Sequence, residues 1–263
     1  MNYKRFLKIM LRSFNYNAAL QLTTQNKAKA KINIKSRKIS LIFRTGTSDA
    51  HLIEKILIKP LYKCEYYIPN MKTPKMILDI GANIGVSTLF FKSIFPEAKI
   101  YAVEPFPENV DLLRENIKGI DGVTIIDKGL GEKDGYKIYY FSDTETNFGG
   151  GTFQKIGHNP EKKYNLEVMS FKTLINKYNI DKIDLIKIDT EGSEYEILTN
   201  IPSEVFNDVS YIVGELHGIK DFETLAFLSQ WFDIGVKKDI NKRLSNFYAI
   251  NKKIKQQLKF KEK

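Results

Sequence analysis

Two apolar segments of this sequence end in groups that hold protons or bind cations. The first, "LIKI" at 185–188, runs directly into a short carboxylate-rich stretch. The second, "SYIVGEL" at 210–216, ends in Glu215 and is followed by His217. Carboxylates and imidazole are the side chains most used for proton transfer near neutral pH, and both bind divalent metals. The carboxylates of the first segment are Asp189, Glu191, Glu194 and Glu196.

A glycine turn lies earlier in the chain, in "ILDIGANIGVST" at 77–88. Gly81 and Gly85 stand between an apolar strand segment and an amphipathic helix. Glycine lets the chain turn sharply beside a ligand, and the helix start offers free amide donors to an anionic group. A dinucleotide site needs another glycine where this chain has Asn83, and no GxxxxGK[ST] motif occurs. Neither NAD nor a P-loop nucleotide is therefore expected.

An acidic residue, Glu104, stands near the end of the next strand segment, "KIYAVEP" at 99–105. It follows the turn by about one strand–helix unit, where a carboxylate can accept both hydroxyls of a ribose. A nucleoside that carries an amino acid and no pyrophosphate fits these features. This describes S-adenosylmethionine, whose cationic sulfonium suits an acidic pocket. The predicted cofactor-binding residues are Asp79, Gly81, Asn83, Gly85, Ser87, Glu104, Pro105, Asp127 and Asp189.

Four motifs carry a resemblance to a known family. "LDIGANIGVSTLFF", "AVEPFPENVDLLRENI", "IDLIKIDTEGSEYEIL" and "GELHG", in this order, resemble the FkbM family of class I S-adenosylmethionine-dependent methyltransferases. The preceding "RTGTSDAHLIEKI" is similar to the lead-in of that family, so the likeness covers about residues 40–218. Asp79, Gly81, Asn83, Gly85 and Glu104 match the family's cofactor motifs. The residues that match its second signature are Asp189, Glu191, Gly192 and Glu194.

The resemblance implies a seven-stranded Rossmann-like methyltransferase sheet and O-methylation of a hydroxyl. Members of the family often act on sugars of surface polysaccharides or on secondary metabolites. The chain departs from the family at Phe171 and Lys172, where a Leu-Asp pair is usual, and at Ser193, where a small apolar residue is common. These departures lie near the expected acceptor side of the site and bear on substrate identity.

The elements that must position these groups alternate between strand and helix from residue 75 onward. Such alternation predicts an α/β fold, with a parallel sheet, helices on both faces and ligands at the carboxyl ends of the strands. The predicted strands are 75–81, 99–105, 123–127, 183–189 and 210–216, with a hairpin at 135–141. The predicted helices are 85–95, 108–117, 170–178, 193–201 and 223–232.

The N-terminal residues read as an attachment to this core. A helix over 2–16, a hairpin over 30–44 and a helix beginning at Thr47, Ser48 and Asp49 are expected. The predicted organisation is residues 1–48 as a basic attachment, 49–251 as the catalytic domain and 252–263 as a Lys-rich tail.

Charge is distributed unevenly along the 263 residues. The net charge is +10, of which residues 1–48 contribute +11 and residues 252–263 contribute +5, so the remaining body carries −6. The first helix places Tyr3, Phe6, Leu7, Met10, Leu11 and Phe14 on one face and basic residues on another. It either docks on its own domain or lies on an anionic membrane surface.

Apolar runs and cysteine content limit the class of protein to which this chain can belong. No apolar run is long enough to span a membrane and no signal peptide is evident. The single cysteine, Cys64, excludes an intramolecular disulfide and a thiolate metal cluster. We therefore expect a cytoplasmic protein that can contact the inner face of the membrane through its basic ends.

Two chemistries can use the carboxylate and histidine cluster. In the favoured, metal-free version, His217 takes the proton of the acceptor hydroxyl, and Glu215 or Asp189 orients it. In the alternative, Asp189, Glu191 and His217 bind a divalent metal that acidifies the hydroxyl. The acids after Asp189 also have an alternative interpretation, in which they play no part in the chemistry. In this interpretation Glu191 caps the following helix, and Glu194 and Glu196 form a solvated face.

Three further features of the sequence have their own interpretation. Lys187 interrupts a buried strand and is expected to pair with an acid. The glycine-rich stretch 146–160, which contains His158, is interpreted as a lid or substrate clamp, or as a plain connection. His51, on the helix after Asp49, is interpreted as structural.

The sequence thus predicts an S-adenosylmethionine-dependent O-methyltransferase with a small-molecule acceptor, most consistent with a saccharide or a nucleotide-linked sugar. A nucleic-acid methyltransferase is the alternative enzyme, but "DTEG" stands where base amino-methylases carry an Asp/Asn-Pro-Pro-aromatic run. A non-catalytic cofactor-binding or membrane-associated scaffold is the alternative from another class. The oligomeric state is not predicted.

Overall fold

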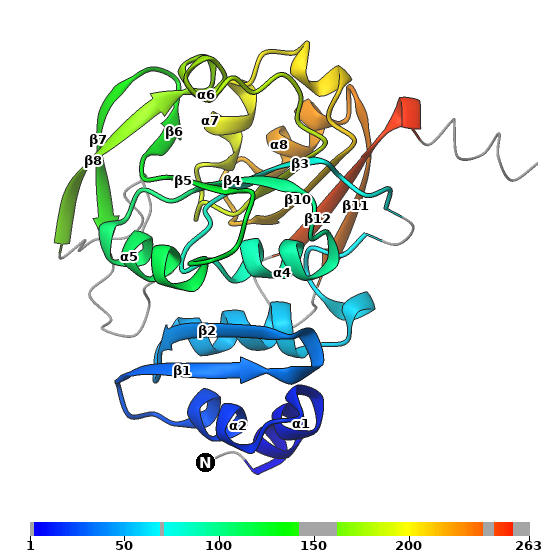
Figure 1. Ribbon diagram of the computed structural model, residues 1–263. Coiled ribbons are helices and arrows are strands. Elements are labelled where there is room, and N and C mark those ends of the chain that lie inside the picture. Colours follow the sequence, from blue (N-terminus) through cyan, green and yellow to red (C-terminus); the bar gives the residue numbers. More distant parts are fainter. Residues whose placement is uncertain (1–2, 69–70, 142–161, 239–244, 255–263) are drawn as a thin grey trace, which may run out of the picture.

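The computed structural model describes residues 3–68, 71–141, 162–238 and 245–254. Its centre is a seven-stranded sheet (Figure 1). The strands are β3 (Met76–Ile80), β4 (Lys99–Val103), β5 (Val123–Ile126), β9 (Leu185–Ile188), β10 (Tyr211–Leu216), β11 (Phe232–Lys238) and β12 (Ser245–Asn251). Their order is β11-β12-β10-β9-β3-β4-β5. The neighbours from β10 to β5 run parallel, and β12 is antiparallel to β10 and β11. The expected α/β class with a mostly parallel seven-stranded sheet is confirmed.

Helices cover both faces of this sheet because its strands are apolar on both sides. Successive strand residues point to opposite faces, so Ile77 packs in one apolar cluster with Phe90, while Leu78 packs in another with Leu174. One face is covered by α4 (Val86–Ile94) and α5 (Pro107–Asn116). The other is covered by α6 (Phe171–Tyr178), α7 (Glu194–Thr199) and α8 (Asp221–Leu228) (Figure 1).

The N-terminal residues form further layers beyond α4 and α5 (Figure 1). They comprise α1 (Tyr3–Ser13), α2 (Tyr16–Thr23), the antiparallel pair β1 (Lys29–Ile34) and β2 (Ile39–Arg44), and α3 (Ser48–Ile53). A π-helical turn, Glu54–Ile58, extends α3. Thr47 caps α3 by accepting a hydrogen bond from the Asp49 N–H at 3.2 Å. The predicted hairpin and the predicted helix start are both present.

These layers share the core of the sheet. Ile9, Leu22 and Phe43 belong to the same apolar cluster as Ile77 and Phe90. The N-terminal attachment therefore contributes to the packing of one sheet face. Among the described helices, none has the length and apolar character needed to cross a membrane.

A smaller sheet lies beside the central one, with order β6-β8-β7. Its strands are β6 (Gly129–Gly131), β7 (Gly135–Phe141) and β8 (Lys162–Ser170). The hairpin expected at 135–141 is β7 paired antiparallel with β8, and β8 was not predicted from the sequence. The stretch 146–160 with His158 lies outside the described residues.

The C-terminal part of the fold differs from the prediction. The helix expected over 223–232 is α8, which ends at Leu228, and Phe232 instead begins β11 opposite Asn251 of β12. Phe232 is buried in this strand. Pairing with β12, which the local sequence does not reveal, decides the conformation here.

Candidate active site

One cavity of about 230 Å³ opens at the carboxyl ends of four parallel strands. Gly81 follows β3, Glu104 follows β4, Asp189 follows β9, and Glu215 and His217 lie at the end of β10; all five line the cavity. The chain passes from β3 to β4 and β5 in one direction and returns to β9 on the other side of β3. Open α/β sheets bind their ligands at this point, where the strand order reverses.

The glycine turn after β3 has the backbone that its sequence predicts. Gly81, Asn83 and Gly85 all have positive φ, at 76°, 51° and 90°. Asn83 tolerates this conformation, and its side-chain oxygen accepts a hydrogen bond from the Ile84 N–H at 2.7 Å. Gly81 and Asn83 line the cavity, whereas Gly85 lies behind it and begins α4. Gly85 therefore shapes the turn and is not among the cavity-lining residues.

Asp79 supports the turn from below. One of its carboxylate oxygens accepts hydrogen bonds from the hydroxyls of Ser87 and Thr88, each at 2.7 Å. The other lies 3.3 Å from the Lys187 ammonium group, which also donates to the Gly81 carbonyl at 2.5 Å. Lys187 is buried and pairs with an acid, as expected. Asp79 is fully buried and does not line the cavity, while Ser87 does.

Glu104 is buried, and its carboxylate is bonded to the glycine turn. It accepts hydrogen bonds from the N–H groups of Asn83 at 2.9 Å and Phe106 at 3.0 Å, and from the Asn109 amide at 3.3 Å. Burial raises the pKa of Glu104, against the effect of these bonds. A carboxylate has about four acceptor positions, so one remains for a ligand. Pro105 lines the cavity beside it.

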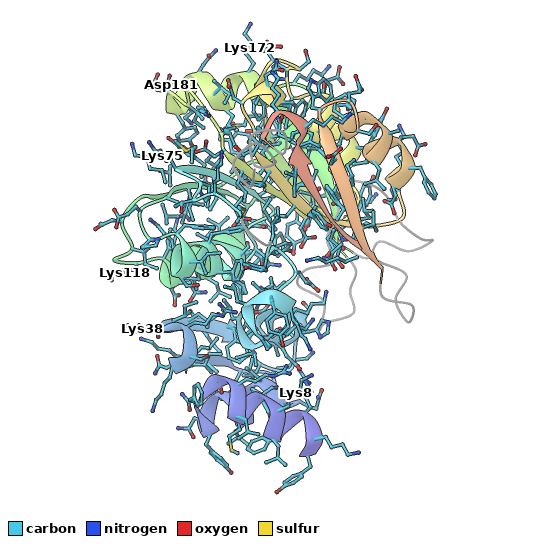
Figure 2. The ribbon with its side chains drawn as sticks, turned by 90° about the vertical axis from the view of Figure 1, so that its right-hand side faces the viewer. Lys8, Lys38, Lys75, Lys118, Lys172 and Asp181 are labelled. Atoms are coloured by element: carbon cyan, nitrogen blue, oxygen red, sulfur yellow. The ribbon has the colours of Figure 1, made fainter. Side chains whose placement is uncertain are left out.

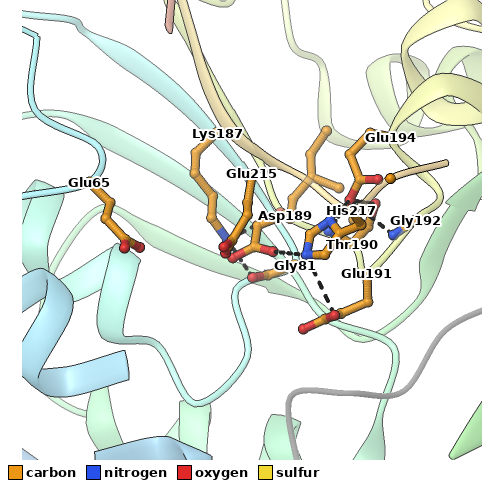
Figure 3. A network of polar contacts seen from close by, with 12 residues as sticks. Glu65, Gly81, Lys187, Asp189, Thr190, Glu191, Gly192, Glu194, Glu215 and His217 are labelled. Carbon is orange, nitrogen blue, oxygen red and sulfur yellow. Dashed lines mark hydrogen bonds and ion pairs between the residues drawn. The ribbon is translucent and has the colours of Figure 1, made fainter. Parts of the chain in front are cut away.

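His217 and Glu194 form a buried pair (Figure 3). The His217 Nδ1 lies 3.1 Å from Oε1 of Glu194. That oxygen also accepts hydrogen bonds from the Thr190 N–H at 2.8 Å, the Thr190 hydroxyl at 3.0 Å and the Gly192 N–H at 3.3 Å. The carboxylate is fixed by these donors, and it orients the imidazole through Nδ1. Nε2 is left without a hydrogen-bond partner among the described residues.

Carboxylates surround the free nitrogen of His217. Asp189 Oδ1 and Glu191 Oε2 each lie 3.5 Å from Nε2. Glu191 therefore faces the histidine, and among the described residues no side chain caps the N-terminus of α7 with a hydrogen bond. Glu194 is not on a solvated face, contrary to that interpretation, because the turn after β9 carries its side chain inward. Glu196 is half-buried and pairs with Lys137 at the surface.

Residues 55–66, which precede the central sheet, contribute Lys55 and Tyr66 to the cavity wall. The Tyr66 hydroxyl donates to Asp189 Oδ2 at 2.8 Å, and the Lys55 ammonium lies 3.2 Å from Glu65 and 3.8 Å from Glu215. These groups place a phenol and a cation opposite the strand ends.

The pKa values in the cluster reflect this crowding. Burial raises the pKa of Glu215 to about 7 and that of Glu191 to about 8, and neighbouring carboxylates add to both shifts. Burial by itself lowers the pKa of His217, but the Glu194 hydrogen bond and the surrounding negative charges outweigh it and raise the pKa to about 10. Burial opposes the ionisation of Asp189, yet Lys187, His217 and Tyr66 hold its pKa below the usual value.

The same cluster contains a set of groups that could hold a metal ion. Ligand atoms of Asp189, Glu215 and His217 all lie within 4.8 Å of one another. The sequence-based alternative used Glu191 in place of Glu215. Carboxylate oxygens and imidazole nitrogen are suitable ligands for several divalent ions.

The structure leaves some predicted residues apart from the cavity. Asp127 is 55% exposed at its side chain and forms a surface ion pair with Arg114 at 2.8 Å, so it is not brought together with the other cofactor candidates. His51, interpreted as structural, lines the cavity.

Three site residues were missed by sequence reasoning. Glu194 was noted but not as the partner of His217. Its position at the start of a helical series that continues with the buried Ile197 and Leu198 is a signal that it faces inward. Tyr66 lies 123 positions from its partner Asp189, and Lys55 is still farther from Glu215 in sequence, so nothing local indicates either contact.

The fold and the site together define a doubly wound α/β protein with the architecture of class I methyltransferases. The profile of the Methyltransferase FkbM domain family matches residues 79–256. The chain belongs to this family of methyltransferases, as the sequence motifs indicated.

Several relatives of this chain are methyltransferases by name. It is 27% identical over 210 residues to Methyltransferase sdnD of Sordaria araneosa, a match that covers 63% of this chain and 77% of the relative. It is 26% identical over 157 residues to Hexuronic acid methyltransferase AglP of Haloferax volcanii, covering 59% and 62%. It is 24% identical over 139 residues to 2-O-methyltransferase NoeI of Sinorhizobium fredii, covering 48% and 57%.

A solved structure supports the fold. Methyltransferase FkbM from Methylobacillus flagellatus superposes with a TM-score of 0.53 at 16% identity over 73% of this chain. The match spans about half, 48%, of that longer chain.

Proposed function

We propose that this protein is an S-adenosylmethionine-dependent O-methyltransferase whose acceptor is a hydroxyl of a saccharide. The observation that carries the proposal is the single cavity that joins two sets of groups. The glycine turn and Glu104 form one wall, and the Glu194–His217 pair with Asp189 and Glu215 forms the other. Such a cavity is suited to hold a nucleoside-bearing methyl donor next to a proton-transfer site.

The residues of the first wall fit the cofactor. Glu104 keeps one acceptor position for a ribose hydroxyl, one fewer than the sequence interpretation required. The N-terminus of α4 offers backbone donors beside Asn83, which suit a carboxylate. The lining is rich in acids, and an acidic lining favours a cation. When bound, S-adenosylmethionine supplies an electrophilic methyl group on a positively charged sulfonium.

The second wall handles the proton that an alcohol must lose. The sequence favours His217 as the base, but the Glu194 hydrogen bond at Nδ1 and the carboxylates around Nε2 outweigh burial and raise the pKa of His217 to about 10, so that its imidazole is protonated at neutral pH. Its Nε2–H instead donates to the acceptor oxygen and stabilises the negative charge that develops there. Glu215 lies within reach of the same point and accepts the proton. Glu194 positions His217. Asp189 and Glu191 lie beside Nε2 of His217 and help to keep the imidazole protonated.

A saccharide acceptor is supported by the relatives. One is named for hexuronic acid and another for 2-O-methylation. A sugar hydroxyl needs a base for its alkylation, which accounts for the second wall. A nucleic-acid substrate is disfavoured, since "DTEG" stands where base amino-methylases carry an Asp/Asn-Pro-Pro-aromatic run, and the excess of basic residues lies at the chain ends.

The proposal is tested by calorimetric titration of the protein with S-adenosylmethionine. We expect binding in the micromolar range, weakened by about tenfold or more in Glu104→Gln because a hydrogen bond to a charged acceptor is lost. Glu196→Gln, which alters a surface acid, serves as the matched control. Repeating the titration with EDTA separates the two chemistries, because metal removal changes binding or turnover only if a metal takes part.

Transfer is then measured with radiolabelled methyl donor and a panel of nucleotide-linked sugars and hexuronic acids. Cofactor binding without transfer to any hydroxyl would favour the non-catalytic scaffold. Absence of cofactor binding by the wild-type protein would overturn the proposal as a whole.

A further inference from the structure

The outermost layer of the molecule, α1 and α2, exposes a cluster of apolar side chains. Tyr3, Leu7 and Leu11 recur every four residues along α1 and form one row, because four residues make about one helical turn. Tyr3 is 65% and Leu11 67% exposed. Six of the eleven large apolar side chains exposed among the described residues lie within residues 3–20. The other three of this group are Phe14, Tyr16 and Leu20.

This row is not the packing face of α1. Phe6, Ile9 and Ser13 are the buried residues of the helix, and the Phe6 ring packs edge-on against Tyr16 at 5.3 Å. The helical periodicity predicted Phe6 on one face with Leu7 and Leu11. The structure divides that set, so α1 docks through one side and presents a second apolar strip outward.

A row of basic residues runs beside the apolar strip. Lys4, Lys8 and Arg12 each follow a member of the apolar row by one position, which is a rotation of about 100° around the helix. None of the three has an ion-pair partner among the described residues, unlike Arg5, which pairs with Glu54 at 2.8 Å. Residues 1–48 contain no acidic residue. The strip is therefore flanked by uncompensated positive charge.

We propose that this α1–α2 face, made of the six exposed apolar residues and the three basic ones, binds the surface of a membrane that contains anionic phospholipids. Amphipathic helices with this combination lie in the interface, with apolar and aromatic side chains among the acyl chains and lysines at the headgroups. The charge argues against a second copy as the occupant, because two such faces repel each other. The inference goes beyond the proposed function and does not depend on it.

The position of the face fits such a contact. The layer of α1 and α2 lies at the end of the molecule away from the central sheet (Figure 1). Lys8 marks this end and Lys172 of α6 the opposite one (Figure 2). The face can therefore rest on a bilayer without burying the central sheet.

The test is sedimentation of the full-length protein with vesicles of phosphatidylcholine, alone or mixed with phosphatidylglycerol. We expect binding only to the mixed vesicles, and weaker binding at high salt. The double variant Lys4→Gln, Lys8→Gln is expected to weaken binding about fivefold for each charge removed. Its matched control is Lys172→Gln, Lys177→Gln on α6, which should bind like the wild type.

A second variant tests the apolar strip. Leu7→Gln with Leu11→Gln leaves the buried face of α1 intact and is expected to weaken vesicle binding by about tenfold or more. Its control is Phe222→Gln, an exposed apolar residue of α8. Circular dichroism verifies that the variants fold.

Several outcomes would overturn the inference. These are no vesicle binding by the wild type, equal binding to both vesicle types, or equal losses in the α1 variants and their controls. A further one is a dimer, detected by analytical ultracentrifugation, that the Leu7 and Leu11 variant abolishes. That result would assign the face to a second copy of the chain.

Discussion

Glu194 illustrates how a single residue can set the chemistry of a neighbour. Its carboxylate is buried and held by two backbone N–H groups and a hydroxyl, so it cannot turn away from His217. A fixed anion at Nδ1 keeps the imidazole oriented and favours its protonated form. Glu194 is thus a positioning residue in the proposed mechanism, while His217 and Glu215 contact the acceptor.

The proposed roles predict a defined pH dependence. The wild-type kcat/KM should rise as Glu215 ionises at a pKa of about 7 and fall as His217 loses its proton at about 10. Glu194→Gln removes a hydrogen bond and a charge that raise the pKa of His217, so the falling limb should move to lower pH. The rate should drop roughly 100-fold.

The measurement combines the rate profile with an NMR titration of the imidazoles, which is tractable because the chain has three histidines. Glu196→Gln is the control and should leave both curves unchanged. A rate that keeps rising up to pH 10 would instead assign the base to His217.

At the scale of elements, the site depends on the close approach of two turns. Gly81 follows β3, and a Cβ built on it would lie 1.9 Å from the Asp189 carbonyl oxygen that follows β9. Its φ of 76° is also unfavourable for other residues. Because Gly81 has no side chain, the turn after β3 can approach the turn after β9 closely.

Gly81→Ala is expected to destabilise the protein by more than about 3 kcal/mol, since backbone must move to relieve the overlap. Gly119→Ala is the matched control. Gly119 has a similar φ of 80° but no atom within 4 Å of the added Cβ, so only the conformational cost of about 1 kcal/mol remains. Denaturant unfolding measures both. Equal losses in the two variants would refute the role of the close contact.

At the scale of the whole molecule, the N-terminal layers and the sheet behave as one packed body. Besides the shared apolar cluster, hydrogen bonds of the buried Asn116 of α5 connect the N-terminal layers to the sheet domain. It exchanges hydrogen bonds with the backbone of Ile42 at 2.6 and 2.9 Å and donates to the Ile84 carbonyl at 2.8 Å. One side chain thereby connects the hairpin, α5 and the glycine turn.

We expect residues 3–66 and the central sheet to unfold in a single cooperative transition. Asn116→Ala should keep one transition but lower the free energy of unfolding by about 2–4 kcal/mol, because buried backbone groups lose their partners. Asn200→Ala removes one local hydrogen bond within α7 and should cost much less. Two separate transitions, followed by fluorescence and circular dichroism, would show instead that the attachment folds independently.

Local sequence pattern was sufficient to predict several parts of the fold. Apolar runs located five strands of the central sheet, glycines located the turn after β3, and the position of Asp189, Glu215 and His217 at strand ends followed from the parallel topology. These inferences succeed because strand and helix periodicity, and the conformational freedom of glycine, are properties of neighbouring residues.

The remaining features depend on contacts between residues that are far apart in sequence. Strand β11 forms one edge of the sheet and pairs with β12, and local propensity does not encode this pairing. Tyr66 meets Asp189 across 123 positions of sequence, and Lys55 meets Glu215 across an even longer separation. The protonation states of His217 and Glu215 follow from burial and from charges assembled by folding, so they have no counterpart in the linear sequence.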